Sequence, residues 1–293
     1  MTRHHWNDEG DDGSRLGGFL RSLLSGIPWS EVAERVDTLR IKVPGSGALR
    51  VRNPNGRIEV LGDDRDDVVV EVAKRARAES EEEAERLLDA IRIHEELSAD
   101  GLELEVLIPR RWNRHGHVNL ELRVPRGLRV QCESVNGKVS VGGMRAPVAA
   151  RSSNGAVTVE DVIGDVSVST ANNKVTCLCT CGGLVARSSN GKIEIREHRG
   201  SIDASTSNGL IRALVEELGP DGVQLATSNG RILLDLPDPV DADVDVRVDN
   251  GMIRNELELC GATRSTDGRL RGTLGRGGAL IRLRTSNGTV TLR

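Results

Sequence analysis

The feature that most constrains the fold of this chain is the dipeptide Asn-Gly, or a close variant of it, which returns at a fixed interval. The first five Asn residues are each 18 residues apart, and the next two steps are 21 residues long. Self-similarity at a fixed period is typical of repeat architectures, in which each unit buries its apolar face against its neighbours. The recurring residues are Asn136, Asn154, Asn172, Asn190, Asn208, Asn229, Asn250 and Asn287.

The residues on either side of each Asn alternate between apolar and polar. Apolar residues stand six and four places before the Asn, as at Leu184 and Ala186. Others stand three and five places after it, as at Ile193 and Ile195. An alternation with period two predicts a strand with one buried face on each side of the Asn-Gly. The buried set changes parity at the Gly, which adopts a positive φ without steric cost, so we expect a turn or bulge there.

Two architectures fit this unit. In an antiparallel meander the Asn-Gly is a two-residue hairpin turn, for which this dipeptide is the strongest short-range signal. In a β-solenoid, similar to a single-stranded β-helix, each unit is one coil of about 18 to 21 residues and the Asn-Gly marks a corner.

Three observations favour the solenoid. Constant spacing suits stacked coils, which must keep register, better than hairpins. The Asn, and the Ser or Thr two places before it, fall on the inward parity, where copies stacked about 4.8 Å apart form hydrogen-bonded ladders. Gly164, Gly182 and Gly200 recur ten places after the Asn and provide a second corner. The sequence therefore predicts an all-β solenoid.

Composition narrows the function classes. The 293 residues include one Phe, three Trp and no Tyr, which a thin aliphatic interior tolerates better than a large globular core. With 40 basic and 44 acidic residues and few aromatic stacking platforms, we expect no nucleic-acid partner. Five cysteines, an odd number, indicate no disulfide framework and suit a reducing compartment.

The first of three expected parts, residues 1–38, is a disordered and helical N-terminal segment. A polar stretch precedes a short helical stripe from Leu16 to Ile27, and Ser30 to Val36 is expected to form another helical turn. The stripe is too short for a transmembrane segment and lacks the features of a signal peptide. We therefore expect a cytoplasmic protein in which this segment caps the solenoid.

The second part, residues 39–127, contains a first coil at Asn55-Gly56 and a strand–helix–strand insertion. Ser80 and Glu83 form a capping box that opens the helix. The third part, residues 128–293, is the continuous repeat array, with a degenerate coil at Asp267-Gly268. The expected buried face of the helix consists of Ala84, Leu87, Leu88 and Ile91.

Five segments of the chain carry a family resemblance: LRVRNPNGRIEVLGDDRDDVVVEVAKRA, SEEEAERLLDAIRI, LRVPRGLRVQCESVNGKVSVGG, SSNGKIEI and TSNGRILLDLP. They resemble the bacterial putative adhesin family, an adhesin-like β-strand-repeat domain of unknown function. The resemblance runs from about residue 39 to the end of the chain. It implies a β-solenoid-like fold, no enzymatic activity and no cofactor, and it leaves a cell-envelope location possible.

Two motifs resemble metal sites. Cys177, Cys179 and Cys181 are weak zinc or copper(I) candidates, because alternate Cβ atoms of an extended strand lie about 7 Å apart, too far for one tetrahedral ion. Asp241 and Asp245 belong to a run with calcium-like spacing, but their alternation with apolar residues indicates the outer face of a strand. We therefore expect no metal.

The function expected from the sequence is non-enzymatic. The repeats predict a structural or interaction protein, a rigid scaffold with adhesin-like binding or self-assembly and a protein or glycan partner. The alternative is a carbohydrate-binding or polysaccharide-cleaving β-helix enzyme with paired carboxylates on adjacent coils. Such sites usually add aromatic platforms for sugar rings, which this chain nearly lacks.

The last unit suggests how the chain would assemble. It runs from Thr285 to Leu292 and is followed by Arg293 alone. A coil that ends a solenoid leaves an unpaired strand edge, which is a template for another chain. We therefore expect self-association through the C-terminal coil edge.

Overall fold

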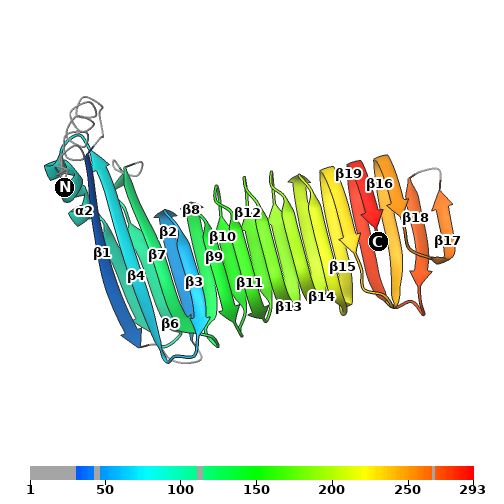
Figure 1. Cartoon of the computed structure of the whole chain (residues 1–293), viewed down its shortest axis with the longest axis horizontal. Helices are drawn as coiled ribbons and strands as arrows, with labels where there is room; N and C mark the ends of the chain where they lie inside the picture. The colour runs from blue at the N-terminus through cyan, green and yellow to red at the C-terminus, as the bar shows by residue number, and fades with distance from the viewer. Residues whose placement is uncertain (1–30, 43–46, 111–114, 266–267) are drawn as a thin grey trace, which may run out of the picture.

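The computed structural model describes residues 31–42, 47–110, 115–265 and 268–293 (Figure 1). These residues form a 19-stranded sheet and the helix α2 (Glu81–Ala90), which confirms the all-β class. The strands are β1 (Glu31–Lys42), β2 (Ala48–Asn55), β3 (Ile58–Asp63), β4 (Asp67–Ala78), β5 (Arg92–Ser98), β6 (Gly101–Leu107), β7 (Gly116–Pro125), β8 (Arg129–Asn136), β9 (Val139–Met144), β10 (Val148–Ser152), β11 (Val157–Ile163), β12 (Val166–Thr170), β13 (Val175–Ser188), β14 (Ile193–Asn208), β15 (Ile211–Asp235), β16 (Ala242–Asn255), β17 (Cys260–Ser265), β18 (Arg269–Leu274) and β19 (Ala279–Leu292).

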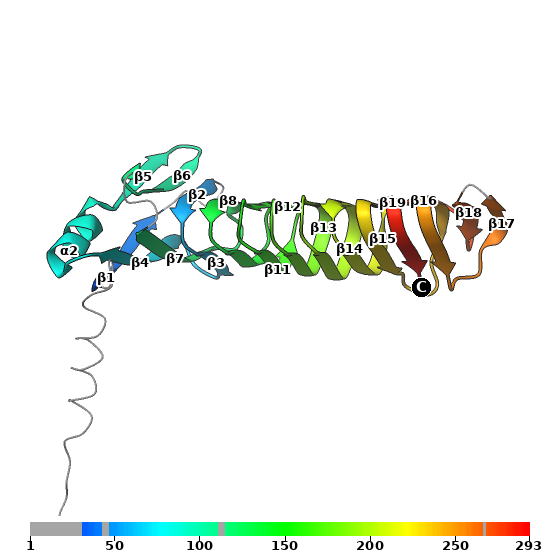
Figure 2. The same cartoon turned by 90° about the horizontal axis from the view of Figure 1, so that it is seen from above.

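The strands lie in two layers that follow the long axis of the molecule (Figure 2). Face 1 contains β2, β8, β10 and β12, and face 2 contains β3, β9 and β11. The longer strands β13, β14, β15, β16 and β19 bend from one layer into the other, which joins both layers into one network. Each coil therefore contributes one strand segment to each face.

Neighbouring coils pair in parallel. Val148 lies opposite Val130 on one side and Val166 on the other, and on face 2 Val157 lies between Val139 and Val175. All six residues are buried. A meander of hairpins requires antiparallel neighbours, so that alternative is wrong for these coils.

The glycines at the two corners are required for different reasons. Gly200 has a φ of 136°, which favours glycine. At Gly191 the reason is contact between coils, because an added Cβ would lie 1.7 Å from the carbonyl oxygen of Asn173. Some of the Asn-Gly glycines, such as Gly251, do have a positive φ, whereas at Gly191 the close stacking of coils excludes a side chain.

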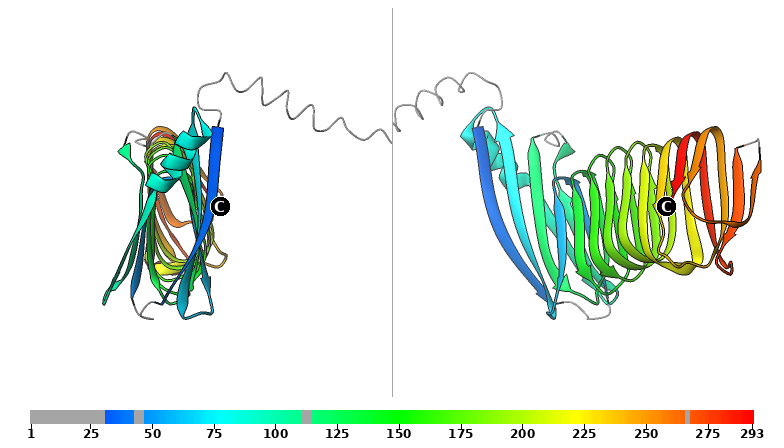
Figure 3. Two further views of the ribbon diagram at one scale, coloured as in Figure 1. Left: turned by 90° about the vertical axis from the view of Figure 1, so that its left-hand side faces the viewer. Right: turned by 45° about the vertical axis from the view of Figure 1, so that its right-hand side comes forward.

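At the N-terminal end, α2 crosses between the two layers. It connects β4 of face 2 to β5, which extends face 1 through β6, and it packs against β1 and β4 (Figure 3). The side chain of Ser80 accepts a hydrogen bond from the backbone N–H of Glu83, as expected for the start of the helix. Ala84, Leu87 and Leu88 are buried, so α2 covers the apolar interior at this end.

The expected helical turn at Ser30 to Val36 is wrong. From Glu31 the chain forms β1, which pairs antiparallel with β4 along its whole length. Long-range strand pairing decides the conformation here, because a short segment has too few internal contacts to hold a helix. The expected domain boundary at residue 38 falls within β1, and the stripe from Leu16 to Ile27 lies outside the described residues.

The C-terminal strand does not lie at the end of the stack. β19 lies between β15 and β16 and pairs in parallel with both, so Leu283 has Leu225 on one side and Val246 on the other. Figure 1 shows β19 between β15 and β16. The expected self-association through a free C-terminal coil edge is therefore wrong, because both edges of β19 are already paired.

The far end of face 1 is a hairpin. β18 pairs antiparallel with β16, and β17 pairs antiparallel with β18. The degenerate coil expected at Asp267-Gly268 is thus replaced by antiparallel pairing, although Asp267 itself is outside the described residues. Leu257 and Leu259, in the connection before β17, are half-buried and pack against the core.

Candidate functional site

The three cysteines of the Cys-x-Cys-x-Cys motif do not converge. Cys177 is buried in the core of β13, and burial raises the pKa of its thiol to about 12. Cys179 and Cys181 are exposed. The Sγ of Cys179 lies 2.9 Å from Oε2 of Glu197, which raises the pKa of the thiol to about 11. Metal binding requires thiolates, so the thiols of Cys177 and Cys179 are poor ligands at neutral pH. The described part of the chain holds no group of three or more His, Cys, Asp or Glu residues placed for a metal ion.

The structure brings the eight Asn residues of the repeat into one continuous row of side-chain hydrogen bonds. In the middle of the row, Asn172 donates to Asn154 at 2.9 Å and accepts from Asn190 at 3.1 Å. Asn287 donates to Asn229 and accepts from Asn250, in keeping with the position of β19. The side chains are exposed along the corner, so the inward orientation expected for Asn is wrong. The remaining links in this row are Asn154 to Asn136, Asn208 to Asn190 and Asn229 to Asn208.

Seven of the eight Asn residues have a Ser or Thr two places before them, and these hydroxyls point inward. Ser152 Oγ donates to the carbonyl oxygen of Gly137 at 2.9 Å, and Thr170 Oγ1 donates to that of Gly155 at 2.8 Å. This column is incomplete, because the buried hydroxyls of Ser188 and Thr285 have no hydrogen-bond partner within the described ranges. These hydroxyls join successive coils and carry no reactive geometry.

A hydroxyl and an imidazole meet inside the solenoid. Thr180 Oγ1 lies 2.9 Å from Nδ1 of His198, and both residues are 1% exposed. Burial lowers the pKa of His198 below its usual 6.5, and its Nε2 has no hydrogen-bond partner among the residues that the structure describes. Although the contact has the geometry of a nucleophile–base pair, it lies in the core and is closed to a substrate.

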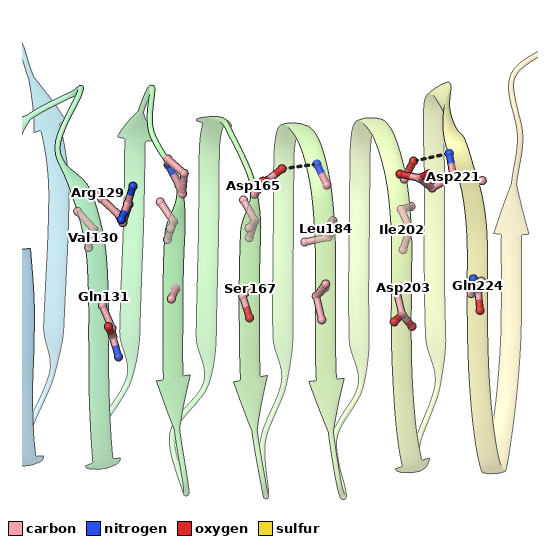
Figure 4. Close-up of a pocket in the computed structure, with 18 residues that line it drawn as sticks. Arg129, Val130, Gln131, Asp165, Ser167, Leu184, Ile202, Asp203, Asp221 and Gln224 are labelled. Atoms are coloured by element: carbon pink, nitrogen blue, oxygen red, sulfur yellow. Dashed lines mark hydrogen bonds between the residues drawn. The ribbon is translucent and has the colours of Figure 1, made fainter. Parts of the chain in front are cut away.

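An open groove of about 520 Å³ crosses the outer surface of face 1 (Figure 4). It runs from β8 through β10, β12, β13 and β14 to β15. Small residues, Ala149, Ser167 and Gly183, form its centre together with Val185. We call this surface the apolar groove.

The two ends of the apolar groove differ in charge. Arg129 stands at the β8 end, and Asp203 and Asp221 stand at the β14–β15 end. Backbone–side chain hydrogen bonds hold its upper rim: the N–H of Gly183 donates to Asp165 Oδ1 and the N–H of Asp221 donates to Ser201 Oγ, each at 3.1 Å.

A second groove, of about 470 Å³, lies on face 1 beside the Asn row. We call it the polar groove, because hydroxyls, two arginines and one carboxylate make up nearly all of its lining. Ser188 and Thr285 belong to its wall, but their hydroxyls are buried and are not exposed in the groove. The lining residues are Ser188, Ser205, Thr206, Ser207, Ala226, Thr227, Ser228, Arg247, Asp249, Arg284, Thr285 and Ser286.

The residues that meet in the polar groove could not be predicted from their order in the sequence. Arg284 of β19 lies directly opposite Arg247 of β16, yet the two come from units that are out of sequential order. The available signal was the repeat offset, since each arginine stands three places before its Asn. The sequence did not indicate which coils lie next to each other.

The outer surface of face 2 holds a self-contained ion cluster. The Glu194 carboxylate is 3% exposed and accepts from Lys174, Lys192 and Arg196. These hydrogen bonds lower the pKa of Glu194 to about 2 against the opposing effect of its burial. Glu194 thus joins basic residues of neighbouring coils, and three cationic side chains around one carboxylate leave this cluster with a net positive charge.

Family comparison agrees with this architecture. The model of the Toastrack DUF4097 family matches residues 103–293. The chain belongs to this family. No curated protein matches it at a significant level. The family is a domain of unknown function, so the comparison establishes architecture and assigns no chemistry.

Several solved bacterial structures are similar to this family member. A putative adhesin from Bacteroides fragilis is 11% identical, with 88% of this chain and 97% of that chain covered and a TM-score of 0.46. A putative adhesin from Parabacteroides merdae is also 11% identical, with 88% and 96% covered and a TM-score of 0.42. A putative lipid binding protein from Parabacteroides distasonis is 10% identical, with 88% and 97% covered and a TM-score of 0.41.

Within the described residues no helix combines the length and the apolar character needed to cross a membrane.

Proposed function

We propose that this Toastrack protein is a non-enzymatic interaction protein, a rigid β-solenoid with an adhesin-like role that binds an extended polysaccharide along face 1. The observation that supports it is that one outer surface carries both the apolar and the polar groove. Strands β13, β14 and β15 contribute to both, so the two grooves form one binding face that spans successive coils.

The shape of this face suits a polymer better than a small molecule. Both grooves are open and follow the solenoid axis across strands about 4.8 Å apart. Small-molecule sites instead enclose most of their ligand. A rigid row of repeated positions presents the same contact many times, which increases avidity for a repeating ligand.

The experiment is retention of the full chain on a panel of immobilised neutral and charged polysaccharides. We expect retention on at least one polymer and its loss in the double variant Ser167→Trp and Ser228→Trp, which fills both grooves. The matched control is Thr158→Trp with Thr176→Trp on the outer surface of face 2, which should bind as the natural chain does. Absence of retention on every polymer, or equal loss in the control, would contradict the proposal.

The same incubations test the enzymatic alternative. Size-exclusion chromatography of the polymer before and after incubation should show unchanged length, since the Thr180–His198 contact is closed to substrates. Shortened chains would make the polysaccharide-cleaving alternative correct. Cell fractionation decides between the cytoplasmic location expected from the sequence and the cell envelope.

A further inference from the structure

We infer that the polar groove recognises an anionic group, a sulfate or a carboxylate, on the polysaccharide that face 1 binds. This inference rests on the proposed function and deepens it by assigning the charge class of the ligand. Arg247 and Arg284 are the residues that would carry the recognition.

The two arginines carry more positive charge than the one carboxylate beside them, Asp249, neutralises. They lie directly opposite each other on the parallel strands β16 and β19, about 4.8 Å apart. Like charges on adjacent strand positions destabilise a sheet. Arg284 also faces Ala226 across its other edge, and among the described residues it has no ion-pair or hydrogen-bond partner.

Arg247 is only partly engaged. Its Nε donates to Oδ1 of Asp249 at 2.9 Å within the same strand, and its side chain is 61% exposed. The terminal N–H groups of its guanidinium remain available. Two guanidiniums side by side present the forked donors that bind sulfate or carboxylate in a bidentate manner.

Asp245, two places before Arg247 on β16, does not neutralise this pair. Asp245 accepts from Arg269 at 3.0 Å and from Arg271 at 3.4 Å, both on β18. Arg282, opposite Asp245 on β19, has a buried Nε that finds no hydrogen-bond partner in the described part of the chain. Positive charge therefore remains on this part of face 1.

The rest of the lining provides hydroxyls along the groove. Ser205, Ser207, Ser228 and Ser286 add donors and acceptors on consecutive coils. From Ser188 to Arg247 the groove crosses four strand spacings, about 19 Å, which is long enough for several units of an extended chain.

The absence of aromatic residues in this lining selects among sugars. Neutral sugar rings are held largely by stacking on aromatic side chains, and none lines the polar groove. Charge-assisted hydrogen bonds need no such platform. The lining therefore favours an anionic polysaccharide over a neutral one. Binding of single-stranded nucleic acid also relies on aromatic stacking platforms, so the lining does not favour it either.

The experiment measures binding of the full chain to heparin as a sulfated probe, polygalacturonate as a carboxylate probe and dextran as a neutral probe. We expect binding to at least one anionic polymer, weakened by salt, and none to dextran. The double variant Arg247→Gln and Arg284→Gln should raise the Kd at least tenfold. The matched control is Arg231→Gln with Arg254→Gln, exposed arginines on face 2 with the same change of net charge, which should stay within twofold.

The conservative variant Arg284→Lys separates charge from geometry. It keeps the positive charge but loses the planar fork, so we expect an intermediate Kd and the greatest loss for the probe that is bound in a bidentate manner. Thermal unfolding of each variant confirms that the fold is unchanged, because both arginines lie on the outer surface.

Several outcomes would overturn the inference. One is equal weakening by the two double variants, which would mean general attraction by net charge. Another is binding of a short single-stranded DNA as tight as that of heparin and with the same arginine dependence, which would remove the selectivity for polysaccharide. Binding to dextran that is lost in the Ser167→Trp and Ser228→Trp variant would overturn the anionic ligand while leaving the proposed function standing.

Discussion

The central coils and the two ends of the solenoid bury apolar surface in different ways. In the centre, each strand segment has a parallel neighbour on both sides in constant register, as Val166 of β12 has in Val148 and Leu184. At the N-terminal end the layers continue as antiparallel strands and α2 crosses between them. At the other end, β19 returns into the stack and an antiparallel hairpin finishes face 1.

The difference shows that a regular repeat does not by itself complete a solenoid. A coil buries its core only against another coil, so the first and last coils need elements that break the repeat. Leu87 and Leu88 of α2 meet this need at one end, while Leu257 and Leu259 meet it at the other. The following predictions test whether centre and ends contribute to stability as this comparison implies.

The largest effect is expected from removing residues 279–293, which contain β19. This leaves facing edges of β15 and β16 unpaired in the interior of the stack, so we expect no cooperative thermal unfolding by circular dichroism. Removal of residues 1–42 deletes β1, which has β4 as its strand partner, and should lower the Tm but keep a cooperative transition. A chain without β19 that melts cooperatively within a few degrees of the full chain would refute this assignment.

Leu88→Ala in α2 tests whether the helix belongs to the core. Leu88 is 1% exposed, so its truncation should lower the free energy of unfolding by about 2 to 5 kcal/mol in urea denaturation. Leu184→Ala, at 2% exposure in a central coil, should cost a similar amount. A loss below about 1 kcal/mol for Leu88→Ala alone would mean that α2 covers the end without stabilising it.

Gly191→Ala tests the close stacking of the central coils. Its new Cβ would lie 1.7 Å from Asn173 O and force the coils apart, so we expect a loss of about 1 to 3 kcal/mol in the same assay. Gly127→Ala is the control, because no atom lies within 4 Å of an added Cβ there. Its effect should stay within about 0.5 kcal/mol. Similar losses at both positions would argue against the stacking explanation.

His198 should make the central coils sensitive to acid. Because burial lowers its pKa below 6.5, the unfolded chain takes up a proton at a pH where the folded chain does not. The free energy of unfolding therefore falls as the pH drops below 6.5, by at most about 1.4 kcal/mol per pH unit. Urea midpoints between pH 5 and 7 should fall more steeply for the natural chain than for His198→Val, since Val215 occupies the next place in the column. Parallel profiles would show that His198 is not responsible.

The smallest effect separates the middle of the Asn row from its end. Asn172→Ala removes two side-chain hydrogen bonds, whereas Asn250→Ala removes the one to Asn287. With each exposed bond worth about 0.5 to 1 kcal/mol, the first variant should lose about twice as much stability as the second. Equal losses would mean that the row contributes through backbone conformation at the corner rather than through its amide bonds.

The sequence by itself determined the coil. The Asn-Gly period, the alternation around it and the capping signal at Ser80 predicted the strands, their buried faces and α2, because periodicity and capping are local properties that each segment carries. The inward hydroxyls, such as Ser152 and Thr170, could be placed from the same parity.

The tertiary structure alone decided which coils are neighbours and how the ends are closed. No local signal states that β19 lies between β15 and β16, because a parallel strand pairs with whatever matching edge is free. The repeat makes all such edges alike. The juxtaposition of Arg247 and Arg284, and with it the polar groove, follows from that insertion. A chain of near-identical repeats thus encodes its unit in every segment, whereas the order of its units is set by pairing at long range.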